Sequence, residues 1–183
     1  MEHSTPATRE SDFLHTLHSF YRQAERFALS LAPTREDARD LLQDALVIAW
    51  QKYDDIHDKA AMKTYVFTVI CNLNRRRFRK RRLEQSLPDE YEDTIRDTEL
   101  LPDRKTDSAL VRDAINQLPD AYREALLLYE VHDLPVAEIA VIQHCSVSAV
   151  KLRLFRARRT VAKKLGVTKS SDYSVPTTLP IRQ

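Results

Sequence analysis

Hydrophobic residues recur every three or four positions through most of the chain, the spacing that places side chains on one face of an α-helix. From residue 12 to residue 31 this pattern is unbroken, and it stops before Pro33. Two further patterned stretches follow at residues 36–53 and 60–82. Because Thr34 stands three positions before the acidic Asp37, the second stretch has the capping-box signature of a helix start. This part of the chain predicts a helical domain.

The second half of the chain has the same spacing in shorter pieces. Patterned stretches cover residues 108–117, 120–129, 136–142 and 147–165, and we expect Ser108 to cap the first of them. A polar break from His144 to Ser146 separates the last two. Ser146 is well placed as an N-cap, because its hydroxyl can accept from the free N–H groups of the next turn. A short helix, a tight turn and a longer helix form the pattern of a helix-turn-helix.

Three segments of the chain lack the helical spacing of hydrophobic residues: residues 83–107, 167–183 and 1–11. Residues 83–107 contain two prolines and many acidic residues, a composition that does not readily bury a core and predicts a flexible linker. Residues 167–183 are rich in Ser, Thr and Pro and predict disorder, and residues 1–11 are polar and expected to fray. The predicted organisation is a helical domain at 12–82, an acidic linker at 83–107, a second helical domain at 108–166 and a tail at 167–183.

Glycine content supports an all-α fold. The chain of 183 residues has a single glycine, Gly166. Glycine-rich phosphate loops and tight β-hairpins both need residues with positive φ, so neither is expected. Alternation with the period of a strand is also missing. We therefore predict two small all-α domains joined by the acidic linker.

The distribution of charge says more than its sum. Lys and Arg number 29 against 27 Asp and Glu, so the net charge indicates little about partners. The basic residues, however, gather at 75–82 and 151–164, with the acidic residues between them. This asymmetry predicts two cationic surfaces separated by an anionic connector. A solvated basic surface or a targeting-like cluster is the simpler alternative for either run.

Two helices carry candidate chemistry for DNA. The basic run at 151–164 lies on the second helix of the predicted helix-turn-helix, where a recognition helix enters the major groove. An ordinary helical hairpin with a solvated face is the alternative. In the 60–82 helix an aromatic residue and two amides precede the arginines: Tyr65, Asn72, Asn74. Aromatic and amide groups can stack on or hydrogen-bond exposed bases, while arginines neutralise phosphates.

The 36–53 helix has a polar side at steps of three and four residues. The residues that define it are Asp40, Gln43, Asp44 and Gln51, with Val47 among them. Such a stripe is either the solvated face of the helix or a surface for a partner protein.

The sequence offers no candidate for catalysis, for a cofactor or for a metal. Cys71 and Cys145 lack metal-ligand spacing, and we expect both to be small buried thiols. The six histidines are scattered, with His132 and His144 expected on loops or helix ends. No run approaches the eighteen apolar residues of a membrane span, and the N-terminus has no signal-peptide core, so we expect a reduced, cytoplasmic location.

Three motifs taken in order resemble the extracytoplasmic-function (group IV) sigma factors of bacterial RNA polymerase. DARDLLQDALVIAWQKYDDI resembles the family's region 2.2, the helix that binds the polymerase clamp. KTYVFTVICNLNRRRFRKRR resembles regions 2.3 and 2.4, and LPDAYREALLLYEVHDLPVAEIAVIQHCSVSAVKLRLFRARR resembles region 4. The resemblance implies a non-enzymatic protein that binds core RNA polymerase and promoter DNA and is held inactive by an anti-sigma protein.

The resemblance also implies roles for matching residues. Asp40, Gln43, Asp44 and Gln51 would face the polymerase clamp. Asn72 would capture a flipped base of the −10 element, flanked by Tyr65, Asn74, Arg75, Arg76 and Arg77. Lys151, Leu152, Phe155 and Arg156 would face the −35 element, with Ser146 and Ser148 near its backbone. Arg159, with Arg153 and Arg158, would meet phosphates or solvent.

The resemblance leaves particular points open. It suggests a turn near residues 71–74, where the periodicity alone allows one continuous helix. The family's usual Gly before the helix-turn-helix is Asp133, and its Gly-Thr-Val at the start of the recognition helix is Ser148-Ala149-Val150, so promoter preference cannot be transferred. Two other functions remain as alternatives: a polymerase-independent helix-turn-helix regulator, and a module whose basic faces bind an acidic partner protein.

Overall fold

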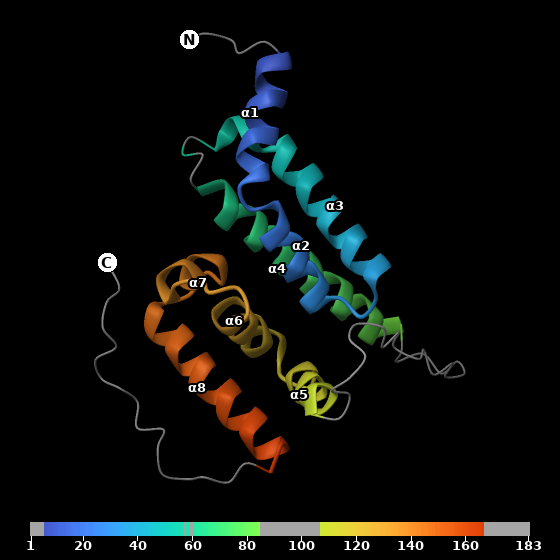
Figure 1. Cartoon of the computed structure of the whole chain (residues 1–183), viewed down its shortest axis with the longest axis vertical. Coiled ribbons are helices and arrows are strands. Elements are labelled where there is room, and N and C mark those ends of the chain that lie inside the picture. The colour runs from blue at the N-terminus through green and yellow to red at the C-terminus, as the bar shows by residue number, and fades with distance from the viewer. Residues whose placement is uncertain (1–5, 57, 59–60, 85–106, 167–183) are drawn as a thin grey trace.

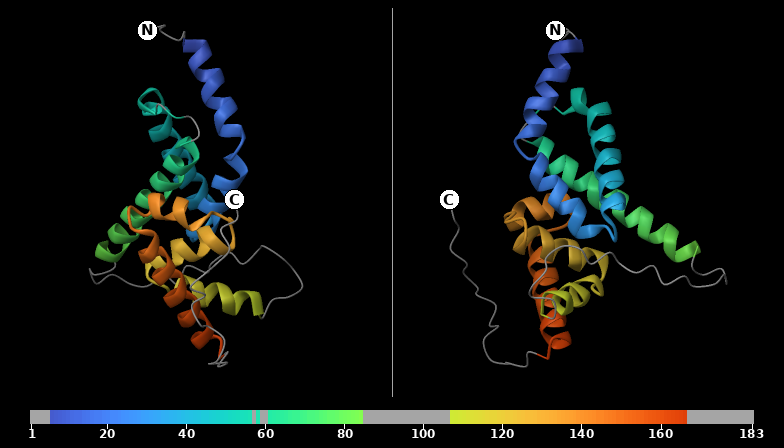
Figure 2. Two further views of the ribbon diagram at one scale, coloured as in Figure 1. Left: turned by 90° about the vertical axis from the view of Figure 1, so that its left-hand side faces the viewer. Right: turned by 45° about the vertical axis from the view of Figure 1, so that its right-hand side comes forward.

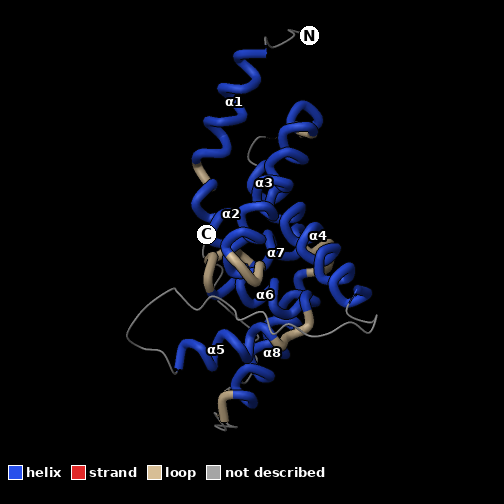
Figure 3. Tube along the Cα trace, turned by 90° about the vertical axis from the view of Figure 1, so that its right-hand side faces the viewer, coloured by secondary structure: helices blue, strands red, loops and turns tan. Residues whose placement is uncertain are grey.

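The computed structural model describes residues 6–56, 58, 61–84 and 107–166, and all secondary structure in these residues is helical (Figures 1 and 3). Four α-helices and one 3₁₀ turn form the N-terminal bundle: α1 Pro6–His18, α2 Tyr21–Leu31, α3 Arg35–Gln51, the turn Tyr53–Asp55 and α4 Ala61–Glu84. Four more form the C-terminal bundle: α5 Asp107–Asn116, α6 Asp120–Glu130, α7 Val136–Ile142 and α8 Val147–Lys164. The all-α prediction is confirmed. None of these helices is long and apolar enough to cross a membrane.

The first patterned stretch is two helices, and the prediction of one helix from residue 12 to 31 is wrong. The chain turns between His18 and Tyr21, where the N–H of Phe20 donates to the carbonyl of Leu17 at 3.1 Å. The hydroxyl of Ser19 also donates to the carbonyl of Thr16 at 2.8 Å. Such a local side-chain bond competes with the helical pattern. Because Leu17 and Phe20 are both buried on either side of the turn, hydrophobic spacing alone does not reveal the break.

Helix α1 also begins earlier than expected, at Pro6, so residues 6–11 are helical and not frayed. Arg9 explains this extension. Its guanidinium donates to Asp54 at 2.9 Å and to the carbonyl of Trp50 at 2.9 Å, and lies 4.0 Å above the Trp50 ring. One turn further on, the Phe13 ring packs edge-on against Trp50 and Tyr53. These contacts join α1 to the end of α3.

Helices α3 and α4 form the main pair of the N-terminal bundle. Thr34 caps α3 as predicted, and its hydroxyl oxygen accepts from the N–H of Asp37 at 3.0 Å. Helix α4 runs without interruption through Cys71 to Asn74. The turn suggested there by the family resemblance is therefore wrong, and the continuous periodicity was the better guide.

The C-terminal bundle follows the sequence prediction closely. The hydroxyl of Ser146 caps α8 by accepting from the N–H of Ala149 at 3.1 Å, which confirms the predicted N-cap. Helix α5 begins at Asp107, one residue before the predicted cap Ser108, so Ser108 lies inside the helix. Helix α8 packs on α5, α6 and α7, and α7 and α8 are joined by the short turn that the polar break predicts.

The two bundles share one continuous hydrophobic core. Buried residues of α1 to α4 share this core with buried residues of α6, α7 and α8, such as Leu128 and Ile139, and with Leu134 in the turn between α6 and α7. Helix α7 packs on α4, and α6 packs on α2 (Figures 1 and 2). This docking was not expected from the sequence, which predicts two separate domains. The predicted linker and tail lie outside the described residues.

Candidate nucleic-acid interface

One side of α8 presents the residues predicted to read DNA. Ser148, Lys151, Leu152, Phe155, Arg156 and Arg159 follow one another at steps of three and one, so their side chains point to the same side of the helix. All are exposed except the half-buried Phe155. Leu152 is 47% exposed, so its side chain is accessible on this side of the helix. The structure therefore brings together all of these predicted residues, with Ser146 just before them.

The other arginines of α8 are bonded within the C-terminal bundle. Arg153 donates to the amide oxygen of Gln143 at 2.7 Å and to Cys145 Sγ at 3.3 Å. Arg158 pairs with Glu130 at 2.6 Å and lies above the Tyr129 ring. Arg158 still has 38% of its side chain exposed, so its expected contact with solvent or phosphate stays a prediction, whereas Arg153 is half-buried by its bonds within the bundle. Among the predicted readers, Arg156 donates to the Tyr122 hydroxyl at 3.2 Å and stays exposed.

The turns around α7 have two residues with left-handed backbone. Asp133 has φ 52° and His144 has φ 48°, and neither is glycine. Left-handed backbone favours glycine, which explains why the resembling family has glycine where Asp133 stands. The N–H of Cys145, directly after His144, donates to the carbonyl of Ala140 at 3.0 Å. The left-handed turn at His144 thus sets the direction in which α8 leaves α7.

On α4 the predicted −10 residues fall on different sides of the helix. Tyr65, Asn72 and Arg76 are separated by seven and four residues and share one side. Asn72 and Arg76 are exposed there, and Tyr65 is half-buried against the core. Asn72 and Arg76 are therefore neighbours on an exposed side of α4 that a DNA strand could contact, with Tyr65 two turns earlier on the same side.

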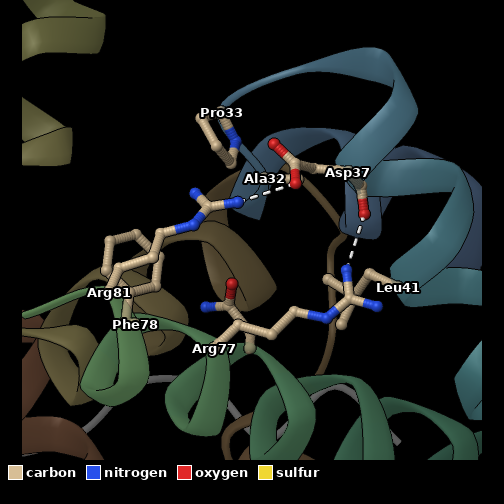
Figure 4. A pocket seen from close by; sticks show the side chains of 8 residues that line it. Ala32, Pro33, Asp37, Leu41, Arg77, Phe78 and Arg81 are labelled. Atoms are coloured by element: carbon tan, nitrogen blue, oxygen red, sulfur yellow. Dashed lines mark hydrogen bonds and ion pairs between the residues drawn. The ribbon is translucent and has the colours of Figure 1, made fainter. Parts of the chain in front are cut away.

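Asn74 points to the opposite side of α4 and is only 3% exposed. It lines a small pocket beside the turn between α2 and α3, with Ala32, Leu41 and Phe78 (Figure 4). The pocket has a volume of about 10 Å³, near the lower limit for one water molecule. The amide nitrogen of Asn74 has no hydrogen-bond partner among the described residues. Asn74 is therefore not available to DNA in this structure.

Arg77 and Arg81 are bonded to α3. Arg77 donates to the carbonyl of Asp37 at 3.1 Å and to the Asp44 carboxylate at 2.7 Å. Arg81 donates to the Asp37 carboxylate at 2.7 Å (Figure 4). The structure thus pairs Arg77, predicted to contact DNA, with Asp44, predicted to contact polymerase.

Arg75 is bonded across the two bundles. Its guanidinium donates to both carboxylate oxygens of Glu124 on α6, with Nε at 3.0 Å from Oε1. The Glu124 side chain is completely buried, and the amide of Gln143 lies 3.4 Å from its second oxygen. Burial raises the pKa of the Glu124 carboxyl, and the bond to Arg75 opposes that rise. Sequence reasoning missed Glu124, although a charged residue inside the apolar stretch of α6 was a usable signal.

Cys71 lies beneath this pair and is fully buried, as expected, and burial raises the pKa of its thiol well above the ordinary value. Cys145 is half-buried, so the expectation of burial holds for it only in part. Among the described residues, no group of three His, Cys, Asp or Glu side chains is placed to hold a metal ion.

The predicted polymerase-binding residues line the outer side of α3. Asp40, Gln43, Asp44 and Gln51 are all exposed. Gln43 also borders a groove of about 430 Å³ between α2 and α3, whose walls include Tyr21, Leu29 and Leu46. Sequence analysis found the polar stripe but not this apolar groove, because three of its lining residues, Tyr21, Glu25 and Leu29, come from α2.

Sequence comparison matches both bundles to the same protein family. Residues 17–84 match Sigma-70 region 2, and residues 108–161 match Sigma-70 region 4. The ECF RNA polymerase sigma factor EcfG of Rhodopseudomonas palustris is 30% identical over 80% of this chain and 81% of its own length. The ECF RNA polymerase sigma factor SigW of Bacillus subtilis is 27% identical over 70% of this chain and 75% of its own length.

Solved structures of similar fold cover both bundles. The sigma factor RpoE of Bartonella quintana, solved in complex with the anti-sigma factor NepR, has a TM-score of 0.71 and 28% identity, covering 86% of this chain and 99% of that one. CnrH, solved in complex with the cytosolic domain of CnrY, shares the fold with a TM-score of 0.63 at 24% identity, covering 87% of this chain and 90% of that one. With both sigma regions in order and a relative of 30% identity over most of its length, the chain belongs to the ECF sigma factors of RNA polymerase.

Proposed function

We propose that this sigma factor directs promoter-specific initiation through three separate surfaces: α3 for core polymerase, α4 for the −10 element and α8 for the −35 element. The observation that carries the proposal is the presence of exposed readers on two helices of different bundles, in a chain that matches both sigma regions. We assign residues 12–82 to region 2 and residues 108–166 to region 4, with residues 83–107 as the connection.

On α8, each exposed group suits a feature of the major groove. Lys151 can donate to guanine O6 and N7, and Leu152 and Phe155 can contact a thymine methyl group. Arg156 and Arg159, at the edge of the same surface, can reach phosphates or guanine. Ser146 and Ser148 lie at the helix N-terminus, where hydroxyl and N–H groups bind the DNA backbone.

On α4, the surface suits a single strand. A base must leave the stack before its edge can be read, and the exposed amide of Asn72 can hydrogen-bond such a base. Tyr65 supports the strand, and Arg76 contacts its phosphates. We leave Asn74 out because it is buried, and Arg77 because it holds α3. Arg75 joins the surface only when Glu124 releases it.

On α3, the exposed polar residues Asp40, Gln43 and Gln51 contact the polymerase clamp, together with the apolar groove beside Gln43. Asp44 also contacts the clamp, and its carboxylate at the same time orients Arg77. The protein acts without catalysis of its own, in the cytoplasm where polymerase works. Because the similar sigma factor RpoE was solved with the anti-sigma factor NepR, we propose that a comparable protein inhibits this one.

The deciding experiment is transcription in vitro with purified core polymerase and a pool of genomic promoters. We expect specific initiation that requires both polymerase and this chain. Tight, specific binding to a palindromic site by the chain alone, with no initiation, would instead indicate a polymerase-independent regulator. Initiation from no promoter in the pool would contradict the proposal.

Asn72→Ala tests the assignment on α4. The exposed amide is needed only after a base has left the stack, so strand opening should fall by about tenfold or more while duplex binding changes little. Opening can be followed by the fluorescence of an adenine analogue placed in the −10 element. Equal losses in opening and duplex binding would indicate a structural role for Asn72.

A further inference from the structure

The Arg75–Glu124 ion pair joins the N-terminal bundle to the C-terminal bundle, and Arg75 is also one of the residues predicted to bind DNA. Arg75 follows Asn72 by three residues on α4 and uses two of its donors on the buried carboxylate of Glu124. A carboxylate and a phosphate bind a guanidinium with the same bidentate geometry. Arg75 therefore cannot hold Glu124 and a DNA phosphate in the same way at once.

We call the packing of α6 and α7 against α2 and α4 the docked arrangement. Several other contacts between the two bundles stabilise it. On α7, the Glu138 carboxylate accepts from the Thr64 hydroxyl at 3.2 Å and lies 3.6 Å from the Lys63 ammonium. On α6, the guanidinium of Arg123 lies 4.7 Å above the Phe78 ring of α4. The amide of Gln23 on α2 donates to the carbonyl of His132 at 2.8 Å. Polar and aromatic contacts thus surround the Arg75–Glu124 pair on both sides.

The docked arrangement is also too short to reach both promoter elements. By their names the −10 and −35 elements lie about 25 base pairs apart, or roughly 85 Å of B-DNA. In this structure the two bundles touch and share one core. Engagement of both elements therefore requires α6 and α7 to leave α2 and α4, which breaks the Arg75–Glu124 pair.

We propose that Glu124 is an internal competitor of DNA: in the free chain it holds Arg75 and keeps the C-terminal bundle docked, and single-stranded DNA opens the chain by taking Arg75 from it. The inference rests on the proposed role of α4 in binding the −10 strand. Once released, Glu124 keeps a hydrogen bond from Gln143 within its own bundle. The competition makes docking and strand binding mutually exclusive.

Removal of Arg75 tests the docked state directly. Without it, the docked arrangement would bury the Glu124 carboxylate without a cationic partner, a strongly unfavourable state. Energy transfer between dyes at the exposed positions Ala61 on α4 and Ala137 on α7, which flank the Lys63–Glu138 contact, reports docking in the full chain. We expect the high-transfer population of the wild type to be largely lost in Arg75→Ala and retained in Arg79→Ala, which removes an exposed arginine one turn away. The double variant Arg75→Glu with Glu124→Arg should recover part of it.

Binding of a mixed-sequence single-stranded DNA tests the competition. If the docked state occupies about nine-tenths of the free chain, Glu124→Ala, which removes both oxygens that hold Arg75, should raise the apparent affinity about tenfold, and added DNA should lower energy transfer in the wild type. Circular dichroism checks that each variant is folded. Unchanged transfer in Arg75→Ala, or transfer in the wild type that DNA does not alter, would overturn the inference. These readouts need no polymerase, so they can fail or succeed independently of initiation.

Discussion

Helices α4 and α8 both carry dense runs of arginine, but they use them differently. On α4, three arginines are bonded to carboxylates of other helices: Arg75 to Glu124, Arg77 to Asp44 and Arg81 to Asp37. On α8, the predicted DNA surface stays exposed, while two arginines on other sides, Arg153 and Arg158, hold the bundle together. Contacts with other helices therefore occupy part of the arginine surface of α4, whereas the predicted DNA surface of α8 is accessible to solvent.

This difference shows that the position of an arginine on its helix decides its role more than the charge run does. An arginine beside a carboxylate of a neighbouring helix becomes a structural contact, and one that faces outward can bind phosphate. In our proposal Arg75 has both roles: it binds Glu124 while the C-terminal bundle is docked, and it binds a DNA phosphate once that bundle has left.

The largest effect is expected for His132, which is 4% exposed between the bundles and packs against Phe27 and Phe67. Burial, with a smaller contribution from Arg26, lowers the pKa of His132 to about 4, and Asp133 opposes the shift. Opening exposes His132 and restores an ordinary pKa near 6.5, so the open state binds the proton more tightly. Docking should therefore be fully stable above pH 6.5 and weaken as pH falls toward 4, by roughly 3 kcal/mol.

Energy transfer measured against pH in wild type and in His132→Phe checks this. The raised pKa of Glu124 acts in the opposite direction, because protonation of that carboxyl favours the buried state. The two chains share Glu124, so the difference between their curves isolates His132. In wild type, energy transfer should begin to fall below pH 6.5 as His132 takes up a proton. In His132→Phe this fall should be missing. Identical curves would show that His132 does not titrate with docking.

The next effect concerns α8. Lys151→Ala should weaken duplex binding at the −35 element by about 1–3 kcal/mol, because a good contact to guanine contributes that much discrimination. Lys163→Ala, an exposed lysine in the last turn of α8, is the matched control and should change affinity only through its charge. Competition between −35 sequences in a transcription assay measures the preference. An unchanged preference in Lys151→Ala would remove it from the reading surface.

Much of the fold could be predicted from periodicity and caps. The turn between α7 and α8, the Ser146 cap and the exposed side of α8 follow from local patterns, because each depends on residues close in sequence. The break at Ser19 was hidden because the apolar pattern continues across it. The continuous course of α4 was visible in its periodicity but obscured by the family resemblance.

The arrangement of the candidate site was less predictable. Helical spacing indicates which side of α4 a residue faces, and it places Asn72 and Arg76 together. It cannot show which side faces another bundle, because Glu124 lies 49 residues from Arg75 in the chain. The burial of Asn74 and the pairing of Arg77 have the same origin in helix packing. Contacts over such distances are set by the tertiary fold and leave only weak local signals.

A smaller effect separates two neighbouring arginines of α4. Arg77→Ala should lower the free energy of unfolding by about 1 kcal/mol, because it removes two bonds to α3 that are partly exposed. Arg76→Ala should leave stability nearly unchanged and reduce the salt slope of DNA binding by about one, as expected for one lost phosphate contact. Denaturant unfolding and salt titrations measure the two. A loss of stability in Arg76→Ala, together with a smaller salt slope in Arg77→Ala, would contradict these assignments.

The smallest effect concerns the turn that presents α8. His144 has φ 48°, where a side chain is strained and glycine is not. His144→Gly should raise stability by about 0.5 kcal/mol, since relief of strain is partly offset by the greater freedom of glycine in the unfolded chain. Val141→Gly, at an exposed position in α7, should instead lower stability by about 0.5 kcal/mol. Denaturant midpoints compare the two, and a loss of stability in both would mean that the His144 side chain supports the turn in spite of its backbone. The exposed surface of α8 would then depend on that side chain, whereas access to Arg75 on α4 depends on Glu124.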